Sequence, residues 1–162
     1  MGLISIHHFR LVRLRHVAYG LAAVDRQSEG GRKTARQAYV IGIWLLVAAI
    51  LIQVLLAGAG VFSGDATYFI WHANYNSLVV FLLPLILIAV GRYARVPRQT
   101  LWLTAAVPGL VIVQSLLLIP YHMQAPGLLR ALAGLHAVNA LFIFLVAVRL
   151  LERVRVPSQP SV

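Results

Sequence analysis

The run YVIGIWLLVAAILIQVLLAGAGVF, from Tyr39 to Phe62, decides the fold class of this chain. It contains no Asp, Glu, Lys or Arg over 24 residues. A helix of about 20 apolar residues is long enough to cross the roughly 30 Å of hydrocarbon in a bilayer. Because lipid offers the backbone no hydrogen-bonding partners, the run predicts a transmembrane α-helix.

Three further long apolar runs follow, at about Phe69–Gly91, Leu101–Pro120 and Leu128–Leu150, and only the last contains charged residues, near its two ends. The whole chain of 162 residues is 60% hydrophobic and 11% charged, with a mean hydropathy of +0.85, whereas soluble domains have about 25% charged residues. The short connections make consecutive helices antiparallel neighbours. The sequence therefore predicts an all-α, integral membrane four-helix bundle at residues 37–151, built from two tandem helical hairpins.

Residues 1–36 differ from the rest of the chain, because they mix apolar residues with arginine and histidine. They are expected to form an amphipathic, basic arm on the membrane surface, or alternatively an arm that docks on a partner subunit. Gly30 and Gly31 are expected to separate this arm from the first membrane span. Residues 152–162 are expected to form a short cytoplasmic tail.

Aromatic residues and prolines add detail to the predicted helices. Pro84 and Pro108 lie inside the second and third runs, where each is expected to kink its helix. Aromatic residues near the predicted helix ends are expected at the membrane surfaces. They are Tyr39, Trp44, Tyr68, Trp71, Tyr93, Trp102 and Tyr121.

The basic residues lie almost entirely on one side of the predicted membrane. Of the 14 lysine and arginine residues, only Arg130 falls on the other side. The rest are Arg10, Arg13, Arg15, Arg26, Arg32, Lys33, Arg36, Arg92, Arg95, Arg98, Arg149, Arg153 and Arg155. This positive-inside pattern predicts that both termini are cytoplasmic. The net charge of +10 is thereby explained by topology and lipid contact, and no nucleic-acid partner is expected.

Three features recur in the same order along the chain: a glutamine, then a histidine, then the tripeptide RVP. The copies lie at Gln53 and Gln114, at His72 and His136, and at residues 95–97 and 155–157. Each copy is a hairpin that enters and leaves the membrane on the same side. The pattern predicts a parallel repeat about an axis along the membrane normal, with the two histidines facing each other.

The two histidines are the candidate metal ligands. The chain has no cysteine, which excludes thiolate sites and disulfides. No acidic residue lies within the membrane runs, so a catalytic role is less expected than a binding role. Asn76 follows His72 by four residues and Asn139 follows His136 by three, so each asparagine shares a helix face with its histidine. Each could orient the neighbouring imidazole, which is the commonest metal ligand.

Two histidines on alternate helices could hold a planar macrocycle between them near the outer face. Gly58 and Gly60 could provide the space that a macrocycle needs. The alternative is that small residues serve helix packing, while histidine and asparagine join helices by hydrogen bonds. His122 is expected at the interface, and His7, His8 and His16 belong to the arm.

The order LIQVLLAGAGVF, WHANYN, VIVQSLL and LHAVNALFIF resembles one four-helix half of the haem A synthase family, over about residues 39–150. It is similar as well to small bacterial membrane proteins of that architecture. The resemblance implies a bacterial inner-membrane protein that holds haem b through His72 and His136. Gln53 and Gln114 would then be pocket residues.

The chain departs from that family in three respects. Its membrane runs contain no acidic residue, Ala73 and Ala137 stand where the family tends to have arginine, and only one half is present. Haem A synthesis is therefore not expected. The resemblance implies single-electron transfer, linked to a quinone or a larger redox complex. Rival interpretations are a cofactor-free accessory subunit of a respiratory or photosynthetic complex, and binding of a chlorophyll-type pigment.

Overall fold

A computed structural model describes the backbone of residues 4–155 and the side chains of residues 27–155. Within this part of the chain all regular secondary structure is helical, and four segments are long and apolar enough to cross a membrane. They are Gln27–Ser63, Ala66–Tyr93, Arg98–His122 and Gly127–Arg155. The predicted all-α, multi-pass membrane bundle is confirmed.

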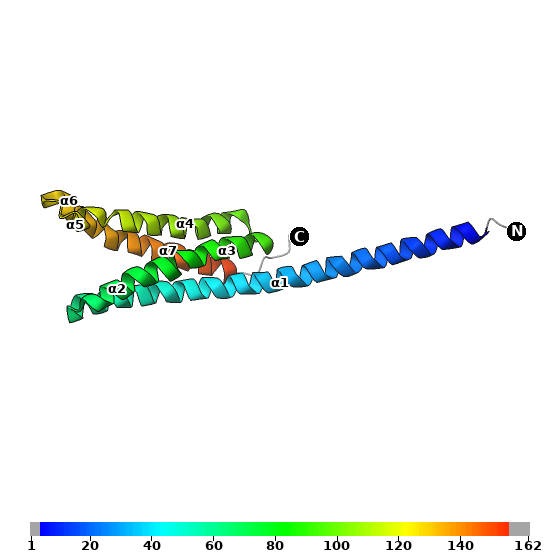
Figure 1. Cartoon of the computed structure of the whole chain (residues 1–162), viewed down its shortest axis with the longest axis horizontal. Coiled ribbons are helices and arrows are strands. Elements are labelled where there is room, and N and C mark those ends of the chain that lie inside the picture. The colour runs from blue at the N-terminus through cyan, green and yellow to red at the C-terminus, as the bar shows by residue number, and fades with distance from the viewer. Residues whose placement is uncertain (1–3, 156–162) are drawn as a thin grey trace.

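Two hairpins form the bundle (Figure 1). The first hairpin is α1 (Ile4–Ser63), α2 (Ala66–Tyr75), the π-helical turn η1 (Asn76–Val80) and α3 (Leu82–Tyr93). The second is α4 (Arg98–Leu116), α5 (Ile119–His122), α6 (Gly127–Ala131), the 3-10 turn η2 (Leu132–Gly134) and α7 (Leu135–Arg155). In cross-section, α1 packs on α3, α3 on α4, α4 on α7, and α7 on α1.

The bundle has two ends, named here by a residue at each. At the Asp65 end, Gly64 and Asp65 connect α1 to α2, and the two hairpins separate (Figure 1). At the Arg155 end, residues 94–97 connect α3 to α4, and α7 ends. Asp65 begins α2 by accepting a hydrogen bond from the Thr67 N–H at 2.8 Å. That bond holds the pKa of the Asp65 carboxyl below its usual value.

Helix α1 is continuous from Ile4 to Ser63 and extends beyond the other helices (Figure 1). The expectation that Gly30 and Gly31 end a separate arm is wrong for the backbone, since both residues lie inside α1. Glycine weakens a helix by about 1 kcal/mol but keeps its backbone hydrogen bond, so it does not by itself end one. Gly31 lies beside Tyr93 of α3, whose hydroxyl would be 2.8 Å from an added Cβ. The predicted position of residues 1–36 on the membrane surface stays a prediction, because the side chains of residues 1–26 lie outside the described part of the chain.

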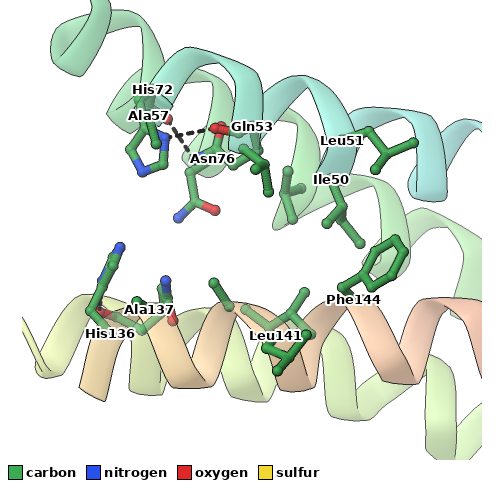
Figure 2. Close-up of a pocket in the computed structure, with 15 residues that line it drawn as sticks. Ile50, Leu51, Gln53, Ala57, His72, Asn76, His136, Ala137, Leu141 and Phe144 are labelled. Carbon is green, nitrogen blue, oxygen red and sulfur yellow. Dashed lines mark hydrogen bonds between the residues drawn. The ribbon is translucent and has the colours of Figure 1, made fainter. Parts of the chain in front are cut away.

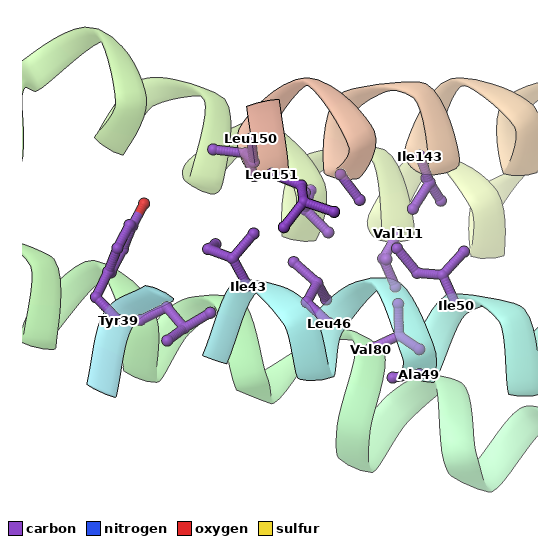
Figure 3. Close-up of a cluster of buried hydrophobic side chains, with 13 residues drawn as sticks. Tyr39, Ile43, Leu46, Ala49, Ile50, Val80, Val111, Ile143, Leu150 and Leu151 are labelled. Carbon is purple, nitrogen blue, oxygen red and sulfur yellow. The ribbon is translucent and has the colours of Figure 1, made fainter. Parts of the chain in front are cut away.

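The core contains apolar side chains from α1, α3, α4 and α7 (Figure 3). On α1 they recur at helical spacing as Tyr39, Ile43, Leu46 and Ile50, all nearly inaccessible. The outward side chains of the spans are apolar too: Leu55 is 69% exposed and Ile86 is 60% exposed. Apolar side chains are equally well solvated by lipid and by the bundle interior. Close packing, rather than exclusion of water, therefore holds such helices together.

Tyr39 lies in this core beside Gly91, near the end of α3, so its side chain faces the other helices and not lipid. Its predicted position near the membrane surface stays a prediction. Its side chain is 1% exposed, and its hydroxyl is 2.6 Å from Thr104 Oγ1 on α4. Because Thr104 donates its hydroxyl hydrogen to the Thr100 carbonyl at 2.9 Å, Tyr39 is the donor to Thr104. This bond joins the first and second hairpins and satisfies a phenol that would otherwise be unpaired in the membrane.

The two prolines act differently on their helices. Pro84 has no N–H to give to the Val80 carbonyl four residues earlier, and its ring crowds that carbonyl. The backbone before it widens into η1, where the Phe81 N–H bonds to Asn76 O at 2.9 Å. Such π-turns often accompany functional sites. By contrast, α4 continues through Pro108.

Candidate functional site

A cavity of about 480 Å³ lies between the two hairpins, near the Asp65 end (Figure 2). Its size falls in the range of roughly 300–1,000 Å³ that is typical of small-molecule sites. The lining is mainly apolar and comes from α1, α2, η1, α4 and α7. Its polar members are Gln53, His72, Asn76, Gln114 and His136.

His72 and His136 face each other across this cavity, as the repeat predicted (Figure 2). Their ring centroids are 6.3 Å apart, and the ring planes meet at 52°. His72 comes from α2 in the first hairpin and His136 from the start of α7 in the second. The separation of the hairpins at this end therefore leaves room between the two imidazoles.

Each imidazole is oriented by a backbone carbonyl of the preceding helix. His72 Nδ1 lies 3.1 Å from Gln53 O, and His136 Nδ1 lies 3.0 Å from Gln114 O. A carbonyl oxygen only accepts, so each Nδ1 carries a proton, and Nε2 is the ring nitrogen left to bind a metal. Protein histidines that bind metals are commonly oriented in this way. The equivalent contacts in both hairpins extend the sequence repeat into three dimensions.

The Gln114 carbonyl is free for this contact because α4 ends at Leu116. The last four carbonyls of a helix lack partners in the helix itself. The N–H of Leu118, which would bond to Gln114 O in a continuing helix, bonds to Ser115 O at 3.2 Å instead. Pro120 disfavours further helix just before it. His136 therefore uses a carbonyl that the helix end exposes.

The asparagines do not orient the imidazoles, contrary to the expectation from their spacing. Asn139 is buried and donates to Leu110 O at 2.9 Å and to Gln114 Oε1 at 2.6 Å. It thus joins α7 to α4 and fixes the Gln114 side chain. Asn76 begins η1 and lines the cavity beside His72 (Figure 2).

Gln53 and His72 form a reciprocal pair, in which each side chain bonds the backbone carbonyl of the other. Gln53 Nε2 donates to His72 O at 2.9 Å, which complements the contact from His72 Nδ1 to Gln53 O. The Gln53 side chain is 9% exposed, and its Oε1 is buried without a partner among the described residues. An unpaired buried acceptor in membrane is costly, so Gln53 offers the cavity an unsatisfied hydrogen-bond acceptor.

The predicted glycines do not line the cavity. Gly60 packs against the ring of Phe69, whose nearest carbons would be 3.0 Å from an added Cβ, and Gly58 has nothing within 4 Å. Gly60 therefore serves the contact between α1 and α2. Space beside the histidines comes instead from Ala57, Ala137 and Ala140. Alanines are so frequent in membrane helices that nothing in the sequence singles these three out.

His122 lies at the Asp65 end but outside the cavity lining, with its exposed ring edge-on to Tyr121 at 5.6 Å between centroids. Among residues 27–155 there is no group of three or more histidine, cysteine, aspartate or glutamate side chains that could hold a metal ion. A metal ion at His72 and His136 would therefore need most of its ligands from elsewhere.

The distance between the two ring centroids can be compared with the distance expected for two imidazoles that bind one metal ion. A metal–imidazole bond is about 2 Å long, and the bonding nitrogen is roughly 1 Å from its ring centre, so two axial imidazoles have centroids about 6 Å apart. The observed 6.3 Å agrees with that value. A porphyrin would supply the four remaining nitrogen ligands, and the apolar walls suit its ring.

Comparison with known proteins assigns no activity to this chain. The model of a family of unknown function, DUF6220, matches residues 53–121, which is less than half of the chain. The matched segment includes Gln53, His72 and Gln114 and ends before His136. No curated protein and no solved structure matches the chain.

Proposed function

We propose that the protein binds one haem b between His72 and His136. The observation that carries this proposal is the facing pair of imidazoles, 6.3 Å apart, each with its Nδ1 on a backbone carbonyl. The resemblance of Gln53, His72, Gln114 and His136 to a half of the haem A synthase family supports the same assignment. Gln53 and Gln114 position the two imidazoles through their carbonyls.

The spacing of the histidines favours one shared metal over two separate pigments. A chlorophyll-type pigment needs a single histidine for its magnesium, so two pigments would each require space in front of one ring. With centroids 6.3 Å apart, the space between the rings admits only one metal. Haem with two axial histidines is therefore the better match.

The proposed role is single-electron transfer. A haem held by both His72 and His136 would supply single-electron chemistry at this site. His72 and His136 would hold the group, and the apolar walls would keep water away. The membrane location fits exchange with a quinone or with a larger redox complex.

Blocking the cavity while both histidines stay in place tests this proposal. Ala137→Phe adds a ring to the cavity lining directly after His136, whereas Ala73→Phe adds the same ring directly after His72 on an exposed surface outside the lining. We expect the purified wild type and A73F to bind haem at one equivalent per chain in a titration followed by absorbance. We expect A137F to bind about 5-fold to 150-fold more weakly, since overpacking costs about 1–3 kcal/mol. Equal haem binding by A137F and the wild type would place haem elsewhere.

A second candidate is a cofactor-free accessory subunit of a larger membrane complex. The continuation of α1 favours it, because the backbone of this helix extends beyond the other helices of the bundle (Figure 1). Under this proposal His72 and His136 serve as hydrogen-bonding links to Gln53 and Gln114. The same titration separates the two candidates, since this one predicts no saturable haem binding.

The proposed orientation places the Arg155 end in the cytoplasm of a bacterial inner membrane. The arginines at that end include Arg92, Arg98 and Arg153, whereas Arg130 lies toward the Asp65 end. Positive residues are retained on the cytoplasmic side during insertion. A periplasm-dependent phosphatase fused after Val162 should be inactive, while one inserted after Gly64 should be active. The opposite pattern would invert the topology and put the histidines near the cytoplasmic face.

A further inference from the structure

A second cavity, of about 540 Å³, lies at the Arg155 end, opposite the histidines. It forms where α3 ends and α4 begins. Its lining includes Ile88, Arg92, Arg98, Leu101, Trp102 and Ala105. We name it the Arg92–Arg98 groove. The proposed haem site does not use any of these residues.

The groove is positively charged where it opens at the Arg155 end of the bundle. Arg92 lies in the last turn of α3 and Arg98 is the first residue of α4. Within residues 27–155 neither arginine forms an ion pair, and Glu152, an acidic residue at this end, is paired with Arg149 at 2.8 Å. The Arg98 guanidinium lies 5.9 Å from the ring centre of Trp102, so that ring supports it from one side. Two guanidinium groups are thus available to an anion.

The rest of the groove is apolar and follows the helices into the membrane. Leu101, Trp102 and Ala105 occupy one face of α4 below Arg98, at helical spacing. Ile88 lies one turn before Arg92 on α3. Trp102 is 64% exposed, which suits the membrane interface. A small soluble anion would leave this apolar wall uncovered.

We propose that the Arg92–Arg98 groove binds an anionic glycerophospholipid. The lipid phosphate accepts hydrogen bonds from the two guanidinium groups, which match phosphate oxygens in a forked geometry. One acyl chain then lies along Leu101, Trp102 and Ala105. Basic pockets between membrane helices commonly recognise anionic head groups.

Trp102 provides a direct probe of the groove. In a W44F/W71F background it is the sole tryptophan, so its fluorescence reports lipid at this site. The protein is reconstituted in vesicles of phosphatidylcholine with increasing brominated phosphatidylglycerol, and quenching gives the binding constant relative to brominated phosphatidylcholine. We expect a preference of about tenfold or more for the anionic lipid, because each basic residue near a membrane contributes about 1 kcal/mol.

Removing two arginines from the groove, and two others from α7 as a control, distinguishes a specific lipid site from general attraction of anionic lipid to the basic end of the bundle. R92Q/R98Q should lose the preference, while R149Q/R153Q, which removes two charges from α7 at the same end, should keep it. Equal losses in both variants would show diffuse attraction and overturn the site. Displacement of the lipid by millimolar glycerol 3-phosphate would overturn the acyl-chain contact and assign the groove to a soluble phosphate.

A second measurement on the chain with all its tryptophans guards against misfolding of the variants. Phosphatidylglycerol added to detergent micelles should raise the thermal unfolding midpoint of the wild type and of R149Q/R153Q more than phosphatidylcholine does. R92Q/R98Q should show equal midpoints in both lipids. A full phosphatidylglycerol shift in R92Q/R98Q would contradict the proposal.

Discussion

His72→Ala and His136→Ala should each abolish low-spin haem in the purified protein. Under the proposed haem site, each substitution would remove one of the two histidines that hold the iron, and one histidine alone would not keep the iron low-spin. The sharp α-band of the reduced spectrum should disappear in both variants, and the haem content should fall several-fold. The comparison is made on reduced spectra at equal protein concentration.

His122→Ala is the matched control, since His122 lies at the same end of the bundle but does not line the cavity. It should keep the wild-type spectrum. Unchanged low-spin spectra in both H72A and H136A would overturn the ligand assignment. Loss of the spectrum in H122A, with H136A intact, would move the second ligand to His122.

Gly91→Val should destabilise the bundle by about 1–3 kcal/mol, as is typical of overpacked cores. An added Cβ at Gly91 would lie 2.7 Å from Leu101 Cδ2 and 2.9 Å from Tyr39 Cε2. The Tyr39 ring cannot withdraw easily, because it is buried and its hydroxyl is bonded to Thr104. The free energy of unfolding, measured by denaturant titration in mixed micelles, tests this expectation.

Gly109→Val gives the control for that measurement. Gly109 also lies inside a membrane helix, but nothing is within 4 Å of an added Cβ there. Its substitution should change the unfolding free energy by well under 1 kcal/mol, apart from a small change in helix propensity. Similar losses in both variants would show that glycine is needed for helix flexibility and not for the contact with Tyr39.

The four spans could be predicted from the sequence because membrane thickness and backbone hydrogen bonding leave few alternatives. The facing histidines could be predicted from the repeat of Gln53 and His72 by Gln114 and His136. The burial of Tyr39 among the other helices could not, because the packing of α1 against α3 and α4 decides which of its side chains face inward.

The partners of the site residues depend on features that side-chain patterns do not reveal. The imidazoles bond to backbone carbonyls, which every residue has, so Gln53 and Gln114 are not marked by their side chains for this role. Asn139 shares a helix face with His136 as predicted, yet the register of α7 against α4 directs it to Gln114. Only the packed structure determines that register.

A reduced-minus-oxidised visible spectrum of the purified protein in mild detergent decides whether one haem lies between His72 and His136. The protein should be expressed with ample haem supply, and the haem should be quantified against protein. We expect a sharp b-type α-band with a shifted Soret band, at one haem per chain. A flat spectrum under these conditions would contradict the proposed haem site and leave His72 and His136 as hydrogen-bonding links between helices.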